Sequence, residues 1–83
     1  MHTGTTMALE PFNRNNPSHT NMVKAAYYAW YGPTDAQQLL ASKGIHIQIS
    51  QISQQYYIFK GAHLDRADRS LNVDHYLNNI ATI

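Results

Sequence analysis

Residues 34–60 read TDAQQLLASKGIHIQISQISQQYYIFK and contain two segments with regular apolar spacing. The first part predicts a short helix over residues 35–43. Thr34 stands three residues before Gln37, which is the spacing of a capping box at a helix start. Apolar residues then recur on one helical face, and Gly44 suits the position just after the last turn.

The second part, residues 45–60, fits two structures. Isoleucines alternate with polar residues over 45–50, which is the period of a strand, yet apolar residues from 49 to 59 recur at helical spacing. A β-hairpin would need a turn near residues 51–54, which contain no Gly, Pro, Asn or Asp. The pattern therefore favours a helix from about 48 to 59, and a hairpin is the alternative.

Ahead of this stretch, residues 18–31 predict a first helix. Apolar and aromatic side chains recur there at helical spacing and form one stripe that would face a core. Ser18 or Thr20 can cap its start, because either hydroxyl can accept an unpaired backbone N–H. Gly32 and Pro33 would end the helix.

The two ends of the chain differ in character. Residues 1–17 are rich in Thr, Asn and Pro and show no sustained period, which predicts a flexible arm with Leu9 and Phe12 docked on the domain. Residues 71–83 return to helical spacing and predict a last helix. We therefore expect a mainly α domain of three or four helices over residues 18–83.

Composition excludes several classes of function. The 83 residues suffice for one small domain, and a net charge of +1 argues against a polyanion binder that relies on charge alone. The absence of Cys excludes disulfides, thiolate zinc sites and Cys nucleophiles. No apolar run is long enough for a membrane helix, so we expect a cytoplasmic protein. The His and Asp spacings fit no zinc module, and no catalytic group is evident, so we expect neither a metal, a cofactor nor an enzyme.

Residues 34–60 resemble a helix-turn-helix DNA-binding unit, and their turn is most similar to that of the arginine-repressor family. In that pattern a helix ends at a Gly, two apolar turn residues follow, and the recognition helix buries two further positions. The matching residues here are Gly44, Ile45, Ile47, Ile52 and Tyr56, while Ile49 stands where a polar residue is usual. The resemblance implies a helix-turn-helix domain, either with or without a wing after the recognition helix.

The resemblance implies that the helix at 48–59 enters the major groove of double-stranded DNA. A Gln amide matches N7 and N6 of adenine, and Ser can donate or accept. The expected base-reading residues are Gln48, Ser50, Gln51, Gln54 and Gln55. The expected phosphate contacts are Thr34, Gln37, Lys43, Lys60, Arg66 and Arg69.

Because the chain has few cations, we expect a homodimer that reads a two-fold symmetric site. The last helix could form the dimer contact or could equally belong to the core of one chain. We expect a sequence-specific transcriptional regulator, most simply a repressor, of the kind that plasmids and phages encode. The alternative is a small inhibitor from a mobile element that binds a host protein through its aromatic first helix or an extended edge at 56–59.

Overall fold

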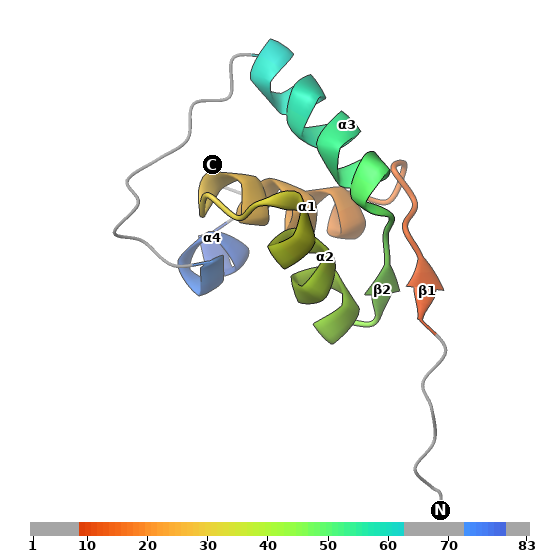
Figure 1. The fold of residues 1–83 in the computed structure, drawn as a ribbon. Coiled ribbons are helices and arrows are strands. Elements are labelled where there is room, and N and C mark those ends of the chain that lie inside the picture. The colour runs from red at the N-terminus through yellow and green to blue at the C-terminus, as the bar shows by residue number, and fades with distance from the viewer. Residues whose placement is uncertain (1–8, 63–72, 80–83) are drawn as a thin grey trace, which may run out of the picture.

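The computed structural model describes residues 9–62 and 73–79 (Figure 1). Within these residues the predicted mainly α fold is confirmed, because four helices and two very short strands account for the regular structure. The elements are, in chain order, β1 (Glu10–Pro11), α1 (Pro17–Tyr28), α2 (Pro33–Ser42), β2 (Ile45–His46), α3 (Ile49–Gly61) and α4 (Val73–Asn79).

Helix α1 lies at the centre of the domain and contacts α2, α3 and α4 (Figure 1). Ala25 and Ala26 are fully buried on it, and such small side chains let neighbouring helices approach closely. Tyr27 of α1 packs edge-on against Tyr56 and Phe59 of α3, with ring centroids 5.2 and 5.4 Å apart. These aromatic contacts therefore join the first and third helices.

Helix α4 packs against α1 through its aromatic residue. The ring of Tyr76 stacks on that of Tyr28 with centroids 5.7 Å apart, and Val73 is buried beside it. The described part of the last helix thus belongs to the core of a single chain, which is one of the two roles that the sequence left open for it. Residues 80–83 lie outside the described part.

Helix α1 begins one residue earlier than its sequence pattern predicts. Asn16 is the N-cap, and its Oδ1 accepts the backbone N–H of Ser18 at 2.9 Å. Pro17 takes the first helical position, where its fixed φ is favourable and its missing N–H costs nothing. The prediction that Ser18 or Thr20 caps this helix is therefore wrong.

Helix α1 ends at Tyr28 in a Schellman motif, short of the predicted end at residue 31. The N–H of Tyr31 donates to the carbonyl of Ala26 at 3.0 Å, and the N–H of Trp30 donates to that of Tyr27 at 3.1 Å. Trp30 occupies the left-handed position of this motif with a φ of 66°, where Gly is usual.

Helix α2 begins at Pro33 rather than at a capping box. Gly32 is its N-cap, and Pro33 again suits the first helical position. Thr34 and Gln37 therefore lie inside the helix, and the predicted box between them is wrong. At the other end, Gly44 adopts the left-handed conformation predicted for it, with a φ of 85°.

Strands β1 and β2 pair in parallel beside the α2–α3 connection (Figure 1). The N–H of Glu10 donates to the carbonyl of Gly44 at 2.8 Å, and that of Phe12 donates to the carbonyl of His46 at 2.9 Å. Pro11 lies between these two donors and faces the outer edge, where a residue without an N–H interrupts no pairing.

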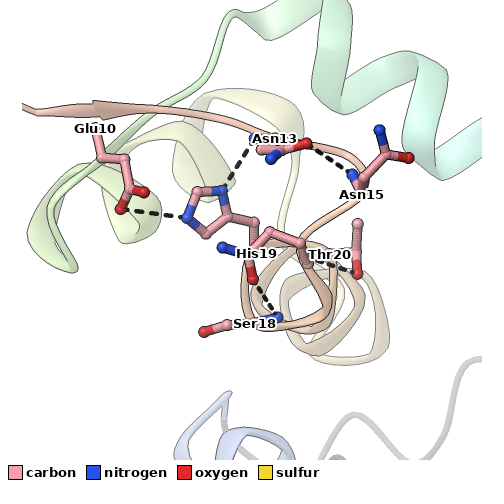
Figure 2. Close-up of polar contacts among 7 residues, drawn as sticks. Glu10, Asn13, Asn15, Ser18, His19 and Thr20 are labelled. Atoms are coloured by element: carbon pink, nitrogen blue, oxygen red, sulfur yellow. Dashed lines mark hydrogen bonds and ion pairs between the residues drawn. The ribbon is translucent and has the colours of Figure 1, made fainter.

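His19 anchors the segment that follows β1 (Figure 2). Its buried ring accepts the backbone N–H of Asn13 at Nδ1, at 3.0 Å, and its Nε2 lies 3.4 Å from Oε1 of Glu10. Because Nδ1 accepts, the ring hydrogen of the neutral imidazole is on Nε2, facing the carboxylate. Phe12 stacks on the same ring, with centroids 6.0 Å apart.

These contacts join part of the predicted flexible arm, 1–17, to the helical domain. The backbone N–H groups of Glu10, Phe12 and Asn13 bond to β2, its neighbour Gly44 and α1, and residues 1–8 lie outside the described part. Phe12 is half-buried against the core, as predicted, whereas Leu9 is exposed.

Candidate nucleic-acid interface

Helix α3 shows which of the two predicted conformations, helix or hairpin, the segment 45–60 adopts. Residues Ile49–Gly61 are helical, so the predicted helix is confirmed and the hairpin alternative is wrong. The helix begins with side-chain capping, because Oε1 of Gln51 accepts the backbone N–H of Gln48 at 3.0 Å. The alternation at 45–46 corresponds to strand β2 alone.

The inner face of this region carries the positions that the sequence pattern assigned to the core. Ile45, Ile47 and Ile52 are buried, and Tyr56 is half-buried. The hydroxyl of Tyr56 donates to the carbonyl of Tyr31 at 2.9 Å, which ties α3 to the end of the first helix. The turn and α3 are therefore fixed against the rest of the domain.

The outer face of α3 presents uncharged polar and apolar side chains and a single cation. Ile49, which stands where the pattern that the turn resembles has a polar residue, points outward and is 44% exposed. The exposed side chains of α3 are Ile49, Ser50, Ser53, Gln54, Tyr57, Ile58 and Lys60. Such a face can approach base edges without a large positive field.

The five predicted base-reading residues do not share one face. Gln48, Ser50 and Gln54 are exposed, as a base-reading role requires. Gln55 is only 9% exposed, because it follows Ile52 by three residues and shares its buried side of the helix. This burial weighs against the base-reading role predicted for Gln55.

Gln51, which was predicted to read bases, also caps the start of α3. It is half-buried, and its side-chain oxygen accepts the N–H of Gln48. A bidentate contact with adenine needs that oxygen and the amide nitrogen together. Base reading by Gln51 would therefore have to share the oxygen that accepts the capping bond.

A hollow of about 260 Å³ lies beside the first half of α3. It is lined by Phe12, Arg14, Gln51, Gln54 and Gln55. Arg14 is exposed here, next to the outer face of the helix, although the sequence placed it in a flexible arm. The pairing of β1 with β2 brings Arg14 to this position, and no local pattern in the sequence indicates that pairing.

The predicted phosphate contacts lie at separate places around α3. Lys43 is exposed at the C-cap of α2, and Thr34 is exposed in the first turn of that helix. Lys60 is exposed in the last turn of α3, away from Gln48 and Ser50. Arg66 and Arg69 lie outside the described residues, as do residues 63–72, where a wing would follow the helix.

Gln37, also predicted to bind phosphate, instead ties α2 to the turn before α3. Its Nε2 donates to the carbonyl of Ile47 at 2.9 Å, and its side chain is half-buried. The amide donor of Gln37 is therefore engaged inside the domain, which weighs against the phosphate role predicted for it.

Replacing Gln37 by Ala is expected to lower the free energy of unfolding by about 1 kcal/mol, because the carbonyl of Ile47 loses its side-chain donor. Urea denaturation followed by circular dichroism measures this change. Gln38→Ala is the matched control, since Gln38 is the next residue of the same helix and is exposed. The Gln38→Ala variant should change the free energy of unfolding by no more than roughly 0.5 kcal/mol. Equal losses of stability in the two variants would contradict a stabilising role for the hydrogen bond from Gln37 to Ile47.

Across residues 9–62 and 73–79, no three His, Cys, Asp or Glu side chains are grouped so that they could hold a metal ion. None of the helices in those ranges has the length and apolar character needed to cross a membrane. Comparisons with protein-family models, with curated proteins and with solved structures found no match to the chain.

Proposed function

We propose that the chain is a sequence-specific DNA-binding regulator, acting as a repressor, in which α2, the turn and α3 form a helix-turn-helix. The observation that carries this proposal is the outer face of α3. It belongs to a helix fixed to the core on its other side, and its first half exposes Ile49, Ser50 and Gln54 without any acidic side chain. A helix with such a face fits the major groove.

In the proposed complex the first half of α3 lies in the major groove. The amide of Gln54 pairs with N7 and N6 of adenine, and the hydroxyl of Ser50 donates to or accepts from a neighbouring base. Ile49 contacts the methyl group of thymine, which gives its exposed apolar side chain a partner. Gln48, at the exposed N-cap, reaches the edge of the same site.

Phosphate contacts flank this base-reading face. Thr34 is exposed in the first turn of α2 and Lys43 at its C-cap, and Arg14 lines the same hollow as Gln54. Arg14 therefore takes the place in the phosphate-binding set that was assigned to Gln37. Because the chain has few cations, one chain binds DNA weakly and its affinity depends only mildly on salt concentration. A homodimer on a two-fold symmetric site doubles the number of phosphate and base contacts.

Fluorescence anisotropy tests the proposal with the duplex upstream of the chain's own gene and a random duplex, each at two salt concentrations. We expect tighter binding to the upstream duplex, with log K falling by about 0.9 per phosphate contact for each unit of log salt. Equal binding to both duplexes, or none, would contradict a base-reading function.

A second candidate function is a protein-binding inhibitor, and the second half of α3 favours it. Tyr57 is 79% exposed and Ile58 is 52% exposed, which are high values for large apolar side chains on one helix. The extended edge predicted at 56–59 is absent, because these residues are helical. A partner would therefore have to recognise a helical surface, and failure of the anisotropy experiment would favour this candidate.

A further inference from the structure

A groove of about 540 Å³ lies between the end of α1 and the second half of α3. It is lined by four aromatic side chains, one serine and one lysine, namely Tyr27, Trp30, Tyr56, Tyr57, Ser53 and Lys60. Its volume falls in the range of small-molecule sites, roughly 300–1,000 Å³. It shares no lining residue with the hollow at Arg14 or with the proposed base-reading set.

Trp30 at this groove is held in an unfavourable backbone conformation. Its φ of 66° is that of the left-handed region, which Gly adopts at a lower cost in free energy. The Schellman motif would close equally well with Gly, yet the position carries the largest of all side chains, and that side chain remains 39% exposed. Backbone strain of this kind clusters at binding and catalytic sites.

We infer that the groove binds a small ligand that combines a planar aromatic ring with a carboxylate or phosphate group. The ring stacks on Trp30 and Tyr57, which present aromatic surface to solvent. The ammonium group of Lys60 pairs with the anion, and the hydroxyl of Ser53 donates to it.

Charge at the groove distinguishes this ligand from a second copy of the chain. None of the residues known to line the groove is acidic, so an anion meets no like charge there. A second copy docked through the same face would bring a second Lys60 to the site without a carboxylate to pair with either. An anionic ligand therefore complements the groove, and a two-fold contact does not.

The fluorescence of Trp30 reports on this groove directly, because the chain has a single Trp. We would titrate the full chain, without DNA, with adenosine monophosphate and with benzoate. These probes separate the two sources of the anion, phosphate and carboxylate. Saturable quenching is expected with at least one of them, and weaker or unsaturated effects are expected with adenosine, inorganic phosphate and acetate. Saturation by neither probe would overturn the inference.

Lys60→Gln is expected to weaken the binding of the active probe roughly ten-fold, because a charge-assisted contact is lost. Lys43→Gln is the matched control, since Lys43 is also an exposed Lys at a helix end but does not line the groove. Equal weakening in both variants would show general attraction by positive charge and would overturn the assigned site.

Trp30→Gly separates ligand binding from folding. Gly relieves the backbone strain, so the melting temperature should not fall sharply, whereas binding measured by calorimetry should be lost. Tyr57→Ala provides a second variant in which Trp30 fluorescence still reports binding, and its exposed side chain contributes little to the fold. Unchanged affinity in both variants would overturn the inference. Since no DNA is present, this result is independent of the proposed regulatory function.

Discussion

Replacing Ile52 by Ala is expected to lower the free energy of unfolding by about 2–5 kcal/mol, the largest effect on stability that we predict. Ile52 is completely buried, with 0% of its surface exposed, where α3 meets the core. The truncation removes apolar contacts and leaves a cavity beneath the helix. Because small domains are stable by only about 5–15 kcal/mol, much of the population should unfold in mild urea, as measured by circular dichroism.

Ile58→Ala is the control for this variant, because it makes the same chemical change in the same helix. Ile58 is 52% exposed, so the loss should be well below that of Ile52→Ala. The pair also tests the conformation of this segment. Residues six apart share a face in a strand but lie on different sides of a helix. Similar losses at the two positions would therefore contradict the helical register of α3.

The second large effect is expected from Gln54→Ala in the proposed DNA complex. Loss of a bidentate contact with adenine should weaken binding to the preferred duplex by about 1–3 kcal/mol, while the stability of the free protein stays nearly unchanged. Anisotropy with the preferred duplex and with a duplex altered at that base pair measures the effect. The variant should lose its discrimination between the two duplexes.

Gln55→Ala should show the opposite behaviour. Gln55 is buried, so its truncation should lower stability while leaving the discrimination between bases in place. If Gln55→Ala relaxed base preference and Gln54→Ala did not, the assignment of the outer face of α3 would be wrong. Equal effects from both would point to an indirect cause, such as a change in the position of the helix.

Local signals in the sequence were sufficient to predict α3 and the end of α2. The spacing of Ile52, Tyr56 and Phe59 indicates one buried side of a helix, and Gly44 supplies the left-handed residue that ends the preceding helix. The start of α2 was missed because two signals overlap there. Gly32 and Pro33 resemble a helix stop, but Pro is equally suited to the first position of the next helix, and this second role is the one found.

The parts of the candidate site that depend on contacts distant in sequence were not predictable. Neighbouring elements decide whether a side-chain amide reaches solvent. The amide of Gln37 bonds to the carbonyl of Ile47 instead, and Gln55 is buried. Two-residue strands are too short to have a period, so nothing in the sequence places Arg14 beside α3. The groove at Trp30 likewise requires the end of α1 to lie against α3.

The parallel pairing of β1 with β2 has a consequence for the newly made chain. Synthesis supplies β1 first, and at about 5–20 residues per second its partner follows only after an interval of the order of seconds. During that interval the backbone N–H groups of Glu10 and Phe12 lack the carbonyls of Gly44 and His46 that they bond in the folded domain, and unpaired groups of this kind can pair with other chains. Pro11 removes a donor from the opposite edge of β1, so that edge is a poor template, and only the edge of Glu10 and Phe12 waits for its partner.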